Sequence, residues 1–167
     1  LAVFTRPDGR LHLFGDSAEG IAPSTETVAA RGRAVVGMLV PSRDGLTRLD
    51  RGGFVSYGLE GGAERIVVTA APPSPPDQPA HSHADILSFE LDIAGRSWIV
   101  DRGVSGYDGD WLRSYVRSTR AHNTVTINDR DQSEMWATFR VGGRADQVRA
   151  TASVSAGTGF RFEGSYR

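Results

Sequence analysis

The sequence has 167 residues, of which 39% are hydrophobic and 23% charged, and this fits one globular domain of ordinary size. The formal net charge of −1 excludes a general attraction to nucleic acid or anionic membrane, and no stretch approaches the roughly 20 apolar residues of a membrane span. Cysteine and lysine are both absent, which excludes thiolate chemistry, disulfides and Schiff bases.

The start of the chain differs from the rest. Residues 11–16 predict a loop, and Glu26–Arg31 predicts a short helix. We therefore expect residues 1–30 to be the end of a preceding helical domain or linker. Residues 31–167 are expected to form a β-domain that is incomplete at its C-terminal end, where the last residues read as a strand that stops early.

From residue 31 onwards, short β-branched runs separated by glycine-containing turns predict an all-β fold, an antiparallel β-sandwich. Alternation is clearest over residues 87–93, which predicts a strand with one buried and one wetter face. The proline-rich residues 71–80 predict an irregular loop that leads to His81, and residues 111–119 suit either a short helix or a loop. The expected strands are residues 34–40, 54–59, 64–70, 87–93, 97–101, 123–128, 137–141 and 147–152.

Three histidines and one aspartate are the candidate site. Residues two apart on a strand point to one side, so an unbroken strand would turn His81 and His83 together to the interior, where both need partners. Asp101 ends an apolar strand beside a glycine turn, where it either caps the turn or reaches a neighbouring strand. His122 opens the strand expected at residues 123–128, on the face opposite its apolar residues, which argues against burial. Two histidines with a carboxylate suit zinc, while carboxylate partners or a substrate are the alternatives.

The order and spacing of these motifs resemble the heparinase II/III-like family of polysaccharide lyases, which includes heparinase and alginate or oligoalginate lyases. The resemblance covers about residues 80–132. It is carried by His81-Ser82-His83-Ala84-Asp85-Ile86-Leu87-Ser88-Phe89, by Val100-Asp101-Arg102-Gly103, by Tyr107, and by Tyr115-Val116-Arg117-Ser118-Thr119-Arg120-Ala121-His122-Asn123-Thr124-Val125.

The resemblance implies a role for each matching residue. His83, Asp101 and His122 match metal-binding positions, usually of a largely structural zinc ion. His81 matches a catalytic histidine near the uronate, and Tyr115 and Tyr107 lie where some alginate-type members place a tyrosine near the substrate. Two arginines, Arg117 and Arg120, either bind a substrate carboxylate or are simply exposed to solvent.

The activity that the resemblance implies is β-elimination in an acidic polysaccharide such as alginate, a glycosaminoglycan or a bacterial exopolysaccharide. In that family an (α/α) toroid precedes the β-sandwich and supplies the main catalytic tyrosine and an asparagine that neutralises the carboxylate. We expect the 167-residue chain alone to be inactive or nearly so and its parent protein to be a bacterial, periplasmic or secreted lyase.

Two other functions are considered. A cupin-like metalloenzyme also carries His-x-His on a strand, but Glu90 follows His83 later than the usual cupin spacing. A non-catalytic sandwich that binds carbohydrate would use tryptophans for stacking, although large aromatic residues at strand positions are more often core. The tryptophans in question are Trp98, Trp111 and Trp136.

Overall fold

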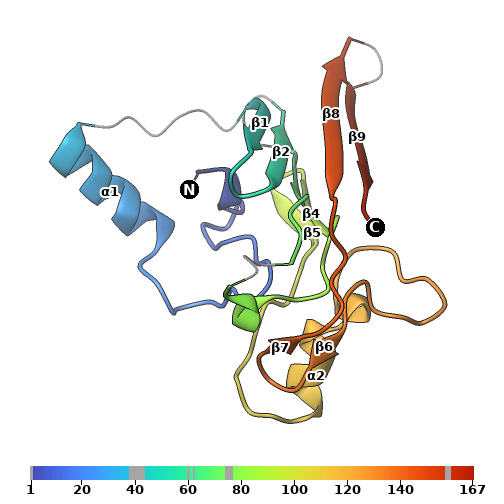
Figure 1. Cartoon of the computed structure of the whole chain (residues 1–167). Coiled ribbons are helices and arrows are strands. Elements are labelled where there is room, and N and C mark those ends of the chain that lie inside the picture. Colours follow the sequence, from blue (N-terminus) through green and yellow to red (C-terminus); the bar gives the residue numbers. More distant parts are fainter. Residues whose placement is uncertain (1, 38–43, 60, 62, 74–76, 157–158) are drawn as a thin grey trace.

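The protein is described here from a computed structural model, which covers residues 2–37, 44–59, 61, 63–73, 77–156 and 159–167. Its centre is an antiparallel sheet of order β1-β2-β3-β4-β5 (Figure 1). These strands are β1 Gly45–Leu49, β2 Phe54–Gly58, β3 Arg65–Thr69, β4 Phe89–Ile93 and β5 Arg96–Ile99. Two antiparallel hairpins follow, formed by β6 Met135–Trp136 with β7 Arg140–Val141 and by β8 Arg149–Ser155 with β9 Gly159–Ser165. The helices are α1 Thr25–Val36 and α2 Trp111–Arg117, with 3₁₀ turns at Ala2–Phe4, Pro79–His81 and Thr119–Ala121. The expected antiparallel β fold is confirmed.

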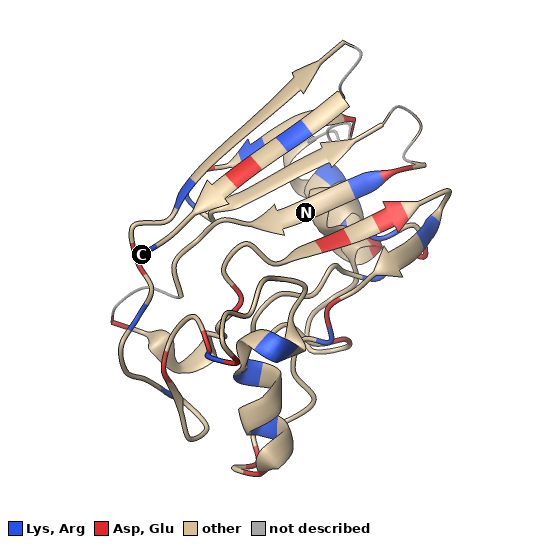
Figure 2. Cartoon of the chain, turned by 90° about the vertical axis from the view of Figure 1, so that its right-hand side faces the viewer, with Lys and Arg blue, Asp and Glu red and all other residues tan. Residues whose placement is uncertain are grey.

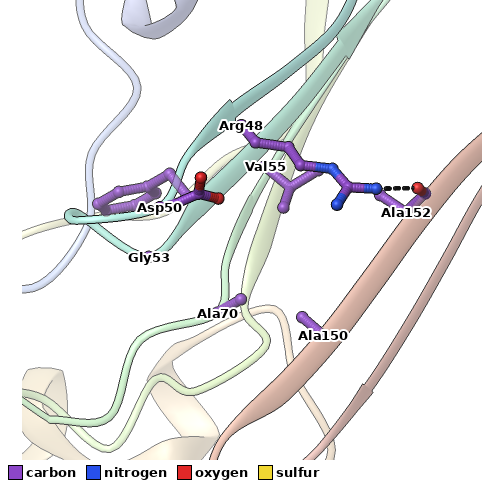
Figure 3. A pocket seen from close by; sticks show the side chains of 8 residues that line it. Arg48, Asp50, Gly53, Val55, Ala70, Ala150 and Ala152 are labelled. Atoms are coloured by element: carbon purple, nitrogen blue, oxygen red, sulfur yellow. Dashed lines mark hydrogen bonds between the residues drawn. The ribbon is translucent and has the colours of Figure 1, made fainter.

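Each face of the central sheet is covered by a different part of the chain. On one face, Phe4 and Phe14 pack edge-on against Phe54, with ring centroids 4.9 and 5.2 Å apart. On the other face lies the β8–β9 hairpin, where Tyr57 stacks on Phe160 at 5.1 Å. The two layers are also joined by a hydrogen bond from the Arg48 guanidinium to the Ala152 carbonyl oxygen (Figure 3).

Two of the turns expected between strands, at Ala94-Gly95-Arg96 and at Asn128-Asp129, are confirmed by the backbone. Ala94 and Gly95 join β4 to β5 with φ angles of 50° and 72°. Asn128 and Asp129 have φ angles of 53° and 56°, inside the isolated bridge between Ile127 and Arg130. Positive φ at both central residues is the type I′ geometry that matches the twist of an antiparallel pair.

Helix α1 confirms the helix expected at Glu26–Arg31 and extends it to Val36. It begins after Ser24, whose side chain accepts a hydrogen bond from the Thr27 amide at 3.2 Å, and it ends at Gly37 with a left-handed φ of 62°. The helix buries no residue and lies apart from the sheet (Figure 1). The strand expected at residues 34–40 is therefore wrong over its first three residues, and residues 38–40 lie outside the described part of the chain.

The segment from His81 to Ser88 is not a strand, so the unbroken strand that would align the two histidines does not form. His81 ends a 3₁₀ turn, Leu87 has a left-handed φ of 61°, and the ladder with β3 begins only at the pair Val68 and Phe89. Leu87 and Ser88 already exchange backbone hydrogen bonds with Thr69, but the positive φ of Leu87 takes the chain out of the extended conformation until Phe89. The strand expected at residues 123–128 is likewise absent, since only the bridge at Ile127 forms there among the described residues.

The buried face of β4 carries the acidic residues Glu90 and Asp92, and its apolar residues lie on the other, partly exposed face. Glu90 and Asp92 are 0% and 1% exposed, because Arg6 and His12 from the first segment of the chain lie against them. Residues 2–16 thus pack on the sheet, and the expected domain boundary at residue 30 stays a prediction.

Charged residues of both signs are spread over the strands and loops rather than gathered on one element (Figure 2), in keeping with the net charge of −1. None of the helices in the described residues is long and apolar enough to cross a membrane.

Candidate functional site

His81 and His83 are brought together by a carboxylate and not by strand alternation. His81 has 57% of its side chain exposed, whereas His83 is fully buried, so the expectation that both point inward is wrong for His81. Their common partner is Asp16: its Oδ2 lies 2.9 Å from Nδ1 of His81, and its Oδ1 lies 2.7 Å from Nε2 of His83. Burial lowers the pKa of His83, and the Asp16 hydrogen bond only partly offsets this, so the buried ring is favoured in its neutral form.

Arg113 closes this cluster from helix α2. Its guanidinium donates to both oxygens of Asp16, and Nη2 lies 3.0 Å from Oδ2. Helix α2 starts at the N-cap Asp110, whose side chain accepts a hydrogen bond from the Arg113 amide at 2.9 Å. This bond fixes the backbone of Arg113, and with it the start of the side chain that reaches Asp16. The Nε atom of Arg113 donates to the Thr138 carbonyl oxygen at 3.0 Å, which fixes the other edge of the guanidinium.

His122 and Asp101 form a second buried pair. The Nδ1 of His122 lies 2.6 Å from Oδ2 of Asp101, and Oδ1 of Asp101 accepts the Gly103 amide at 2.9 Å. Asp101 therefore both caps its turn and reaches another segment. Burial opposes protonation of His122, but the hydrogen bond and charge of Asp101 outweigh it and raise the pKa of His122. His122 is 7% exposed, so the expectation that it lies away from the interior is wrong.

The residues expected to hold zinc fit that ion in part. The rings of His83 and His122 lie 5.1 Å apart, and each leaves one buried nitrogen without a hydrogen bond in the described structure, Nδ1 of His83 and Nε2 of His122. Two bare imidazole nitrogens are suitable zinc donors. However, no three His, Asp or Glu side chains in the described ranges are arranged around one ion, and both oxygens of Asp101 already have partners. The metal therefore stays a proposal.

Aromatic side chains flank His81. The Tyr107 ring lies 6.2 Å from the His81 ring and 5.6 Å from that of Phe139, and all three residues are partly exposed. The Arg113 guanidinium lies 5.1 Å from the Tyr107 ring centre, a cation–π distance. Tyr115, on α2, is 37% exposed but makes no ring contact with His81 in the part of the chain described. The structure thus brings one of the two candidate tyrosines to the candidate catalytic histidine.

The two candidate substrate-binding arginines differ in environment. Arg117 is 0% exposed and donates to the carbonyl oxygens of Ser82 and Ala137 at 3.1 and 2.9 Å, so for this residue exposure to solvent is excluded. Burial, followed by the nearby charge of Arg113, lowers its pKa. Arg120 has 57% of its side chain exposed. Substrate binding stays a prediction for both, and in Arg117 it would require the side chain to leave its carbonyl partners.

A network of buried charges lies next to the site, on the face of the sheet that residues 2–16 cover. Glu90 accepts hydrogen bonds from Arg6 at 2.8–3.0 Å, from the Leu13 amide at 2.8 Å and from the Asp101 amide at 3.1 Å, and it contacts Nδ1 of His12 at 2.7 Å. Glu90 thereby connects the chain that carries Asp16 to the strand end that carries Asp101.

Sequence reasoning missed Asp16, Arg113 and Phe139. Asp16 lies 65 residues before His81, and nothing local to either residue predicts their contact. The glycine that precedes Asp16 was a usable signal: Gly15 has a left-handed φ of 53°, and a Cβ there would lie 3.2 Å from the His81 carbonyl oxygen. At Gly15 the missing side chain therefore permits the close approach of this loop to the His81 backbone.

Comparisons with known proteins agree with this architecture. The family model described as heparinase II/III-like, C-terminal, matches residues 41–164. A heparin-sulfate lyase of Pedobacter heparinus is 35% identical over 89 residues, which are 50% of this chain and 13% of that protein.

Two solved structures share the fold. A heparan sulfate lyase from Pedobacter heparinus has a TM-score of 0.64 at 24% identity, covering 93% of this chain and 25% of its own. A heparinase III gene product has a TM-score of 0.63 at 19% identity, covering 99% of this chain and 28% of its own. The chain thus spans between 13% and 28% of the length of these relatives. Because the family model matches most of the sequence, the chain belongs to the heparinase II/III-like family and carries its C-terminal β-sandwich region.

Proposed function

We propose that this chain is the β-sandwich part of a lyase that cleaves a uronic-acid polysaccharide by β-elimination, with His81 in catalysis. The observation that carries the proposal is the placement of His81. It is the exposed histidine of the cluster, its Nδ1 is held by a buried carboxylate, and a tyrosine ring flanks it. The relatives' names favour a glycosaminoglycan of the heparin or heparan sulfate type over alginate or a bacterial exopolysaccharide.

The chemistry requires a proton acceptor at C5 of the uronate, donors for the developing charge on its carboxylate, and an acid for the departing O4. A neutral imidazole suits the first role, since histidine's ordinary pKa is about 6.5. Tyr107 stands beside His81 and is a candidate to donate to the substrate or to the leaving oxygen. We assign the remaining groups to a toroid domain, which would form the opposite wall of the cleft in a bacterial periplasmic or secreted protein.

A structural zinc ion is part of the proposal, with the buried nitrogens of His83 and His122 as donors. When bound, the ion would hold the two rings rigidly. Each ring is also held by a carboxylate of this chain, His83 by Asp16 and His122 by Asp101.

The test follows the ultraviolet absorbance of the unsaturated uronate as heparan sulfate, alginate and other uronate polysaccharides are cleaved. The full-length protein is expected to form this product, and the 167-residue chain alone is expected to form little or none. His81→Ala should abolish turnover while leaving the melting temperature nearly unchanged, because the side chain is largely exposed. Arg120→Ala tests the predicted carboxylate contact in the same assay. Arg10→Ala, at an exposed side chain outside the candidate site, is the matched control. Persisting turnover in His81→Ala would refute the assignment.

A second candidate is carbohydrate binding without catalysis. It is favoured by the tryptophans, since Trp98, Trp111 and Trp136 are 67%, 76% and 56% exposed and the expectation that they are core is wrong. Binding of a uronate polysaccharide without any unsaturated product from the full-length protein would support this candidate. The cupin-like alternative is not retained, because the chain belongs to another family and Glu90 is committed to Arg6.

A further inference from the structure

The side chain of Asp16 contacts both histidines of the His81-Ser82-His83 motif, and neither proton transfer nor the proposed metal gives it a role. Its side chain is only 4% exposed. Nδ1 of His81 lies at 2.9 Å from one carboxylate oxygen, and Nε2 of His83 lies at 2.7 Å from the other.

Each oxygen of Asp16 also receives one nitrogen of Arg113. The carboxylate therefore has two partners on each oxygen, which uses its full capacity to accept. The Arg113 guanidinium, which is always charged, contacts both oxygens and favours the ionised form of this carboxylate. An ionised carboxylate cannot donate, so both histidine nitrogens that face it must carry a hydrogen.

This requirement determines the tautomer of each ring. Neutral His81 carries its hydrogen on Nδ1 and keeps a lone pair on Nε2, and neutral His83 has the reverse arrangement. The 3.4 Å approach of Arg113 Nη1 to His83 Nε2 is then a contact between two donors that share one Asp16 oxygen. For His83, the consequence is a bare Nδ1, which agrees with the absence of a hydrogen bond to that buried atom.

We propose that Asp16 is a positioning residue for the reaction: it holds His81 in the Nδ1–H tautomer, so that Nε2 is the nitrogen that accepts the substrate proton. This inference rests on the proposed function for its catalytic part. Its structural part, the tautomer, stands independently of any activity. A carboxylate that orients an imidazole in this way is common behind histidines that act as bases or ligands.

The loop that carries Asp16 is held in place on both sides. Behind it, the left-handed Gly15 lies so close to the His81 carbonyl oxygen that a side chain would crowd it. Ahead of it, the Ser17 carbonyl oxygen accepts the Val104 amide at 2.9 Å, and a Cβ on Gly103 would lie 2.0 Å from that same oxygen. The backbone on both sides of Asp16 is therefore fixed, and this fixes the position from which its carboxylate reaches His81.

The first experiment measures the imidazole nitrogen shifts of the four histidines by NMR in the 167-residue chain, at a pH where His81 is neutral. The expected result is a hydrogen on Nδ1 of His81 in the unaltered chain. An exposed histidine without a partner instead favours the Nε2–H form. Finding Nε2–H or an averaged pair of shifts for His81 would overturn the proposal before any variant is made, so the test does not depend on whether a variant folds.

The second experiment compares Asp16→Asn with Asp8→Asn, the same change at an exposed aspartate of the same segment, which pairs with Arg10. In Asp16→Asn, His81 is expected to lose the pure Nδ1–H form. In the full-length protein, kcat should fall about 10–100-fold, the range for partners that orient a functional histidine, while KM changes little. Asp8→Asn should alter neither quantity.

The outcomes separate the two proposals. If the unaltered full-length protein forms no unsaturated product, the proposed function fails, and with it the catalytic part of this inference, while the tautomer measurement still decides the structural part. If it does form product and Asp16→Asn retains kcat, the positioning role is refuted although the proposed function stands. A loss of kcat with an unchanged His81 tautomer would also refute it, since the loss would then have another cause.

Discussion

Glu90→Gln is the change that tests most directly whether the first residues of the chain are part of the folded sandwich. Arg6, 5% exposed, would keep its charge in a buried position but lose its carboxylate partner. Removing one member of a buried ion pair costs about 3–5 kcal/mol. Glutamine retains one accepting oxygen for the Leu13 or Asp101 amide, so we expect a loss near the lower end, about 3 kcal/mol.

The assay is equilibrium urea unfolding followed by far-ultraviolet circular dichroism. Glu163→Gln is the matched control, because Glu163 pairs with Arg161 on an exposed strand where such pairs contribute about 0–1 kcal/mol. A loss for Glu90→Gln that is no larger than the control's would refute the reasoning. It would mean that residues 2–16 are not held on the sheet by this network.

Three further predictions concern pH, backbone and metal. Burial opposes protonation of His12, but Asp92 and Glu90 outweigh it and raise its pKa above 6.5; the folded chain then binds this proton more tightly than the unfolded chain. The contribution of protonated His12 to the free energy of unfolding is therefore complete below about pH 6.5 and is lost as the pH rises through the raised pKa. His12→Gln should remove this part of the pH dependence, measured by urea unfolding. Gly103→Ala should cost about 1–3 kcal/mol more than Gly9→Ala in urea unfolding, because both glycines have positive φ but only Gly103 would clash, with Ser17. Elemental analysis should find zinc in the purified protein and not in His122→Ala; zinc-free protein whose melting temperature is unaffected by a chelator would contradict the metal proposal.

The parts of the fold that could be predicted are those with local causes. Strands β2 and β3 were predicted to within one residue at each boundary, because β-branched runs are bounded by turn-forming residues. The positions of two turns were also predicted, because their residues tolerate positive φ, although the turn type was not. The family resemblance identified the motif histidines, and the comparisons confirm the family.

What failed depended on partners far away in the sequence. The alternation of residues 87–93 was real, but it could not show that Arg6 and His12, about 80 residues earlier, turn Glu90 into a core residue. The same holds for Asp16, whose role arises only where the chain returns to His81. Nor did the local sequence show that His81 ends a 3₁₀ turn, which removed the expected alignment of the two histidines, or that Leu87 adopts a left-handed φ.

The packing of residues 2–16 has a consequence for how such proteins can be divided. The family model starts at residue 41, so a fragment cut there would discard Asp16 and Arg6, and with them the holder of His81 and the counter-charge of Glu90. A recombinant or shuffled sandwich that begins at that point would keep every motif residue and still lose the support beneath them. The unit of this chain that can be exchanged is therefore longer than the segment matched by the family model, and its useful boundary lies before the loop that carries Asp16.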